Sequence, residues 1–282
     1  DGKAYFETST NQFIVWDATA GAWIQLDSDG TGAFAFQNRW GASFDGTDDT
    51  ITIPQGTFDL GSDNWTLSMW ARPTNISTTS ETLLLIEGDS GATDRLGFFI
   101  RSNLFAVSDW FNTNIDYSTT ISNNTWYHFL AVKNGNGSTD IHLYLDGEKV
   151  AQGQHGSSPS YGIDSRDATL GGTGDPGISL PFEGQIDEFG FWKSALSPSD
   201  ISSIYNGTAP NGKPTDLTLA SSYDTDRTAN LVGYWRMGDD SNDSPSSDPT
   251  SNSIATITDS SGNGNDLVQA TASRQPTFKA LD

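Results

Sequence analysis

Cysteine is absent from this chain of 282 residues, and basic residues are few. The lack of thiols excludes disulfides, thiolate metal sites and a cysteine nucleophile, and it leaves the redox compartment open. The chain has 14 Lys and Arg against 36 Asp and Glu, a formal net charge of −22. Because nucleic acid binding needs Lys and Arg on phosphates, we predict no nucleic acid partner. The acidity fits two compatible interpretations, which are solubility in salty surroundings and binding of hard cations such as Ca²⁺.

Long apolar runs are also missing. None approaches the roughly 18 residues of a membrane-spanning helix, so we expect no membrane insertion. The chain instead contains 29 Gly, 9 Trp and 34% hydrophobic residues, which is enough for a core. Gly together with frequent Ser, Thr, Asn and Asp favours many turns and short strands. We therefore expect one large β domain or two small ones.

Residues 1–38 predict a small β module. Three strand-like runs, 4–7, 13–17 and 22–26, are separated by turn-like segments, which indicates a meander. The sequence GKAYFETSTNQFIVWDATAGAWIQL resembles short β motifs that recur in bacteriophage tail fibres and other virion appendages. A module of this size is marginal alone, so it would anchor the chain or pack on copies of itself. The alternative is an ordinary leading hairpin of the following domain.

From residue 39 onwards, short apolar or alternating segments recur about every ten residues. Such spacing is the signature of a β-sandwich. The segments are bounded by Gly, Asn, Ser or Asp, and they cover residues 65–73, 82–87, 96–101, 104–110, 126–133, 140–145, 148–152 and 168–171.

The stretch 182–205 predicts a strand followed directly by a short helix. Phe189 and Phe191 continue the strand pattern, and the apolar period then changes. Ser197 fits an N-cap and Pro198 the first helical position, with Asp200 suited to the positive end of the helix.

Several of these pieces, taken in order, resemble one known family. They are SFDGTDDTITI at 43–53, WTLSMWARP at 65–73, WYHFLAVK at 126–133 and GQIDEFGFW at 184–192. Over about residues 42–206 they are similar to the laminin-G-like, pentraxin-like domain of the concanavalin A-like lectin/glucanase superfamily. The resemblance implies an all-β fold, an antiparallel jelly-roll sandwich.

The C-terminal stretch resembles the beginning of the same family. LVGYWRMGDD at 231–240 and TDSSGNGNDL at 258–267 are similar to strands that normally precede the SFDG motif. The tail is therefore either a truncated second copy or a circular permutation, in which 231–282 supplies the first strands of a domain spanning 39–282. We favour permutation, because it is tolerated in compact domains and because residues 42–206 alone would expose a sheet edge. The same order recurs in virion-associated members of the family.

The resemblance also bears on catalysis. Glucanases of the superfamily carry an E-x-D-x-(x)-E pattern on one strand, but here Gln185 replaces the first acid before Asp187. Because a carboxamide can neither protonate a leaving group nor act as a nucleophile, we predict that the chain is not an enzyme. His128 and His142 lie on strand patterns, where a structural role is expected. The G-x-S-x-G, H-E-x-x-H and Walker motifs are also absent from the sequence.

The resemblance implies one structural Ca²⁺. Many relatives hold it with a late aspartate and backbone carbonyls, which maps here to Asp187 with Asp45 or Gly46 and with Asp239 of the tail. Ca²⁺ takes six to eight oxygen ligands, so carboxylates and carbonyls combine readily. In the alternative interpretation, Asp187 only accepts hydrogen bonds from turn amides.

Aromatic residues outside the predicted core positions are candidates for stacking on sugars. Trp110, Tyr117 and Tyr161 are the predicted ligand-binding residues, although each also fits a core or turn position. By resemblance, the core positions are Trp65, Trp70, Trp126 and Trp235.

Together these observations predict a non-enzymatic protein of the virion surface, a bacteriophage tail appendage whose lectin-like domain attaches to a cell-surface glycan of the host. The expected location is extracellular, with other virion structural proteins as partners. A homotrimer is expected because proteins of virion appendages often act as trimers. The first alternative is a secreted or cell-surface bacterial carbohydrate-binding or adhesion module, and the second is a glycoside hydrolase.

Overall fold

The computed structural model describes three N-terminal strands as backbone and most of residues 38–281. The described part omits residues 59, 61–63, 77–79, 88–94, 109–113, 117–119, 136–139, 154–166, 174–179, 207–213, 241 and 246–251. The chain forms two compact units, Asp1–Gln37 and Asn38–Asp282.

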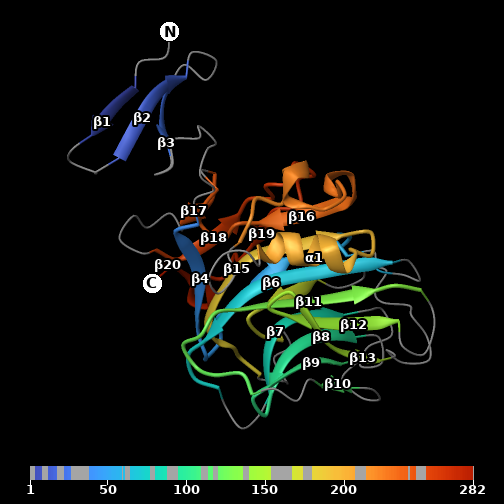
Figure 1. Ribbon diagram of the computed structural model, residues 1–282. Coiled ribbons are helices and arrows are strands. Elements are labelled where there is room, and N and C mark those ends of the chain that lie inside the picture. The colour runs from blue at the N-terminus through green and yellow to red at the C-terminus, as the bar shows by residue number, and fades with distance from the viewer. Residues whose placement is uncertain are drawn as a thin grey trace. The chain divides into compact units, whose positions relative to one another are not determined.

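The first unit contains a three-stranded antiparallel sheet (Figure 1). Its strands are β1 (Ala4–Glu7), β2 (Gln12–Asp17) and β3 (Ala22–Leu26). β2 lies in the middle and pairs with both neighbours. The strand positions agree with the predicted runs to within one residue.

The second unit is a sandwich of two antiparallel sheets, so the predicted all-β sandwich is confirmed. The first sheet has the order β10-β9-β8-β7-β14-β5-β19-β18-β17. In chain order its strands are β5 (Ile51–Ile53), β7 (Ser80–Glu87), β8 (Arg95–Arg101), β9 (Leu104–Ser108), β10 (Asn114–Asp116), β14 (Ala168–Leu170), β17 (Ser244–Pro245), β18 (Ile254–Ile257) and β19 (Leu267–Val268).

The second sheet has the order β13-β12-β11-β6-β15-β4-β20, and β16 also pairs with β15. In chain order its strands are β4 (Trp40–Asp45), β6 (Trp65–Pro73), β11 (Tyr127–Lys133), β12 (Ile141–Leu145), β13 (Glu148–Gly153), β15 (Glu183–Trp192), β16 (Leu231–Trp235) and β20 (Thr277–Ala280). The helices are α1 (Pro198–Tyr205) and the short 3-10 turns Ala220–Ser222, Thr228–Asn230 and Ala272–Arg274. None of the helices in the described ranges is long and apolar enough to span a membrane.

The main core fills the space between the two sheets. Period-2 alternation along β15 sends Phe189 and Phe191 into this core. The ring of Phe189 stacks on that of Trp235 with a centroid distance of 4.9 Å, and Phe58 meets Phe191 edge-on at 5.0 Å.

A second core lies on the outer face of the second sheet, beneath α1. Ile201 and Ile204 of the helix pack there with Trp192 and Tyr234. The predicted N-cap is present, because Ser197 Oγ accepts from Asp200 N (3.1 Å) while Asp200 Oδ2 accepts from Ser197 N (3.1 Å).

The tail contributes strands to both sheets. β16 pairs with β15 through Phe189 and Trp235, and β20 pairs with β4 through Ala42 and Phe278. β19 joins the other sheet where Val268 faces Thr52. Residues 231–281 thus belong to the same compact unit as the strands before α1.

Candidate functional site

A bulge in β15 brings two acidic side chains together inside the protein. The register of β15 against β6 shifts between Asp187 and Gly190, and Glu188 has a left-handed φ of 47°. Such a bulge redirects side chains locally. Asp187 and Glu188 are 1% and 2% exposed, so neither faces solvent.

The turn after β16 adds a third carboxylate. Asp239 Oδ2 accepts from the backbone N of Arg39 (2.6 Å) and of Trp40 (3.1 Å), which fixes the turn to the start of β4. Asp187 Oδ1 accepts from Glu188 N at 2.8 Å. The negative charge of Asp239 contributes to raising the pKa of both Asp187 and Glu188, as expected for three acids in one neighbourhood.

A cationic and a phenolic group lie against Glu188. Its Oε2 accepts from the Tyr234 hydroxyl, and its Oε1 lies 3.6 Å from Arg236 Nε. Burial raises the pKa of Glu188 to about 8, against the lowering effects of Arg236 and Tyr234. Burial, and next the charge of Glu188, raise the pKa of Asp187 well above its usual range. Both carboxyls are therefore poorly compensated as anions, and a proton or a bound cation would stabilise them.

Four oxygens of this neighbourhood are buried and accept no hydrogen bond from the described residues. They belong to four side chains and are Asn38 Oδ1, Asp187 Oδ2, Glu188 Oε1 and Asp239 Oδ1. We call these four residues the bulge cluster. A buried oxygen without a donor costs free energy, which protonation or a bound cation removes.

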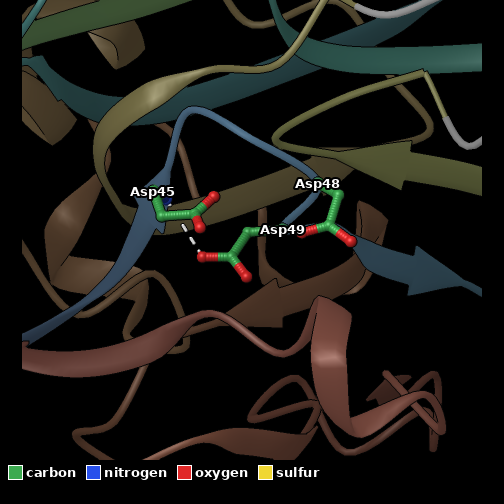
Figure 2. Close-up of side chains that lie close together, drawn as sticks. All are labelled: Asp45, Asp48 and Asp49. Carbon is green, nitrogen blue, oxygen red and sulfur yellow. Dashed lines mark hydrogen bonds between the residues drawn. The ribbon is translucent and has the colours of Figure 1, made fainter.

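A second acidic group lies in the turn between β4 and β5. Figure 2 shows Asp45, Asp48 and Asp49 close together there. One carboxylate oxygen from each residue lies within 4.8 Å of those from the other two. Asp49 Oδ2 accepts from Asp45 N at 3.0 Å. Burial, and next the charge of Asp45, raise the pKa of Asp49 to about 6. Gly46, with φ 74°, forms the turn close to Glu183.

The structure divides the predicted calcium residues between these two places. Asp187 and Asp239 lie together, whereas Asp45 pairs with Glu183, four residues before Asp187 on β15. Four strand residues span about 13 Å, so Asp45 and Gly46 do not reach Asp187. Sequence reasoning missed Asn38 and Glu188. The predicted ligand-binding residues, Trp110, Tyr117 and Tyr161, lie outside the described residues.

Two places in the described structure carry side chains of the types that catalytic sites use. Gln185 is buried, and its Oε1 accepts from Arg72 Nη1 at 3.1 Å. Ser68 Oγ and His128 Nε2 lie 2.6 Å apart, but both residues are buried, and the cavity they share with Glu188 measures only about 10 Å³. That volume suits at most one water molecule. Neither place admits a sugar.

A wide groove lies on the outer face of the second sheet, next to α1. Its volume is about 890 Å³. The walls come from the ends of β11, β12 and β13 and from the segment that joins β15 to α1. The floor is apolar, with Val132, Tyr144 and Leu196, while Asn64 and Asn134 stand at an exposed rim. We call this the β12–α1 groove. A smaller hollow of about 210 Å³ lies on the outer face of the first sheet, beside Phe99 and Arg101.

Comparisons with known proteins agree with this architecture. The family model of the concanavalin A-like lectin/glucanases superfamily matches residues 45–202. No curated protein sequence matches the chain significantly.

Among solved structures, a candidate carbohydrate-binding protein from Bacteroides ovatus aligns with a TM-score of 0.61 and 15% identity, covering 96% of this chain and 68% of that one. The heptameric SAP-like pentraxin of Limulus polyphemus aligns at 0.46 with 14% identity, covering 59% and 82%. The CBM40 of Ruminococcus gnavus IT-sialidase, bound to α2,3-sialyllactose, aligns at 0.44 with 15% identity, covering 57% and 94%.

Proposed function

Because the chain belongs to the concanavalin A-like lectin/glucanase superfamily, we propose that its sandwich is a lectin-like carbohydrate-binding domain. The β12–α1 groove carries this proposal. Its volume of about 890 Å³ falls in the usual range of ligand sites, and its apolar floor with a polar rim suits a sugar, which has both kinds of surface. The similarity in fold to the Bacteroides ovatus protein supports the same function.

We further propose that binding occurs without turnover. Hydrolysis of a glycosidic bond uses two carboxyl groups on either side of that bond, about 5–9.5 Å apart in an open cleft. Here Gln185 is an amide, and the neighbouring acids Asp187 and Glu188 are covered. The groove itself has no acidic side chain among its described lining residues.

A glycan array combined with a reducing-sugar assay tests this function. We expect the full chain to bind a subset of glycans and to release no reducing sugar from them. An array without any bound glycan would overturn the carbohydrate-binding proposal. Release of reducing sugar from a bound glycan would instead indicate a hydrolase.

For the biological setting we propose a virion surface, where the lectin-like domain of a bacteriophage tail appendage attaches to host glycans. The compact N-terminal unit with its meander supports this role, since such a module can join the domain to other virion proteins or to two further copies of the chain. Detection of the chain in purified virions tests the proposal. Its presence only in culture supernatant or on bacterial cells would favour the adhesion module, and light scattering tests the homotrimer.

We also propose a structural Ca²⁺ at the bulge cluster. The cluster fits a hard cation, because it offers buried oxygens from Asn38, Asp187, Glu188 and Asp239 that accept no hydrogen bond from the described residues. Of the three acids there, Glu188 lies 3.6 Å from Arg236, and Asp239 lies 3.7 Å from the largely exposed Arg39. A divalent cation would displace protons from these acids and would link the tail to β15 and β4.

The calcium proposal predicts a shift in melting temperature. Saturating Ca²⁺ at about 100 times its dissociation constant stabilises a protein by about 2.7 kcal/mol, which for a domain of this size is about 5 °C or more. We expect this shift in the wild type, its reversal by chelator, and its loss in Asp187→Asn.

Asp48→Asn is the matched control, since it removes one carboxylate from the other acidic group. We expect it to keep the calcium shift. If Asp48→Asn loses the shift and Asp187→Asn keeps it, the ion binds in the turn between β4 and β5. Equal melting temperatures with calcium and with chelator in the wild type would remove calcium from the proposal.

A further inference from the structure

The β12–α1 groove differs in charge from the rest of the molecule. Acidic residues outnumber basic ones 36 to 14 in the chain. The described lining of the groove nevertheless contains Lys149, Lys193 and Arg227 and no Asp or Glu. In a protein of net charge −22, a lining with basic and no acidic side chains departs from the average composition. The ammonium of Lys149 also donates to Gln152 Oε1 at 2.6 Å.

The three cations come from different parts of the chain, and the fold brings them to one place. Lys149 lies on the edge strand β13, and Lys193 directly follows β15. The backbone N of Lys193 donates to Asn230 O at 2.9 Å, which holds the end of β15 close to the stretch before β16 that carries Arg227.

Arg227 is held by a carboxylate that the groove does not expose. Its Nε donates to Asp200 Oδ2 at 2.9 Å, and the Asp200 side chain is fully buried while that of Arg227 is 25% exposed. Asp200 also accepts from Thr225 N (2.9 Å) and from Ser197 Oγ (2.8 Å). Since a guanidinium has five N–H donors, the ion pair orients Arg227 and leaves further donors for a ligand.

We propose that this groove binds an anionic glycan, whose carboxylate or sulfate groups contact Lys149, Lys193 and Arg227. The inference rests on the proposed carbohydrate-binding function and names the sugar class of the same site. Ammonium and guanidinium groups form short, charge-assisted hydrogen bonds with both kinds of acid group. The exposed side-chain amides of Asn64 and Asn134 can form hydrogen bonds with the neutral hydroxyls of the same oligosaccharide. A net charge of −22 repels anions in general, so the cationic groove also gives the surface one preferred place for them.

The test measures binding of the full chain by calorimetry to pairs of sugars that differ only in charge. The first pair is a galacturonate oligosaccharide and its methyl ester, and the second is a sulfated galactan oligosaccharide and its desulfated form. We expect at least one charged member to bind at least about tenfold more tightly than its neutral partner. The pair that shows the difference identifies carboxylate or sulfate as the recognised group.

Substitutions of the basic residues test whether the charged sugar binds in the β12–α1 groove. We expect Lys149→Gln with Lys193→Gln to weaken binding of the charged sugar by about tenfold or more. The matched control is Lys279→Gln, an exposed lysine on β20 at the opposite edge of the same sheet, which should change affinity by less than about twofold. Arg227→Lys keeps the charge but loses the planar donor set, and it should weaken binding without unfolding the protein.

Two outcomes overturn the inference and leave the proposed function intact. Equal affinity for charged and neutral members of both pairs would show that charge is not recognised. A preference for the charged sugar that the double lysine variant retains would place the site elsewhere on the molecule. Absence of binding to every sugar, here and on the array, would instead contradict the proposed function.

Discussion

Trp235→Ala is expected to lower the free energy of unfolding by about 3–5 kcal/mol, the usual cost of removing a large aromatic side chain from a core. Trp235 lies on β16 in the tail, yet it is fully buried between the two sheets. Its ring stacks on Phe189 at a centroid distance of 4.9 Å, and its Nε1 donates to Asn265 O at 2.8 Å. The ring also lies directly over Gly233, so alanine would leave a cavity lined by strands that are fixed by their own pairing.

Denaturant-induced unfolding measures this effect, with Trp40→Ala as the matched control. Trp40 is 37% exposed, so its removal should cost about 1 kcal/mol or less. A loss below about 1 kcal/mol for Trp235→Ala would mean that the main core is stable without the tail. The large loss is what we expect if residues 231–282 complete the sandwich rather than begin another domain.

Local patterns in the sequence predicted the elements of the fold well. The switch from strand to helix in 182–205 could be located because its signals are local, with alternating Phe189 and Phe191 followed by Ser197 and Pro198 at helix-start positions. The faces of β15 could also be predicted from the local sequence, since a period of two assigns each side chain to one face of the sheet.

The candidate sites could not be predicted in the same way, because long-range register decides them. Asp45 and Asp187 lie on neighbouring strands, but pairing of Asp45 with Glu183 places them about four residues apart along the sheet. The bulge at Glu188 has no sequence signal of its own, and Asn38 is distant from it in the chain. The β12–α1 groove likewise joins residues 149, 193 and 227, whose common charge is visible only after folding.

His128→Gln is expected to change how stability depends on pH. His128 is 2% exposed, and burial lowers its pKa from 6.5 to about 3. Ser68 Oγ lies 2.6 Å from its Nε2, and the rings of Trp70 and Tyr205 stack beside it. Asp146 accepts from the backbone N of His128 at 2.8 Å and not from the ring, so no carboxylate bonds to the imidazole among the described contacts.

The sign follows from where the proton binds. The unfolded chain takes up a proton on this histidine below about pH 6.5, whereas the folded protein does so only near pH 3. The stability due to neutral His128 is therefore complete above pH 6.5 and is lost as the pH falls from 6.5 towards 3. One such group changes the free energy of unfolding by about 1.4 kcal/mol per pH unit, or about 3 kcal/mol between pH 6 and pH 4.

The raised pKa values of Asp187 and Glu188 act in the opposite direction, because protonation favours the folded state for those groups. They are present in both proteins, so the difference between wild type and His128→Gln isolates the histidine. We expect this difference to be constant between pH 7 and pH 8 and to shrink by about 3 kcal/mol between pH 6 and pH 4 as the wild type loses stability. Unfolding curves at each pH measure it. A difference that stays constant down to pH 4 would mean that the folded protein protonates His128 as readily as the unfolded chain. The burial of His128 beside Tyr205 of α1 argues against that outcome.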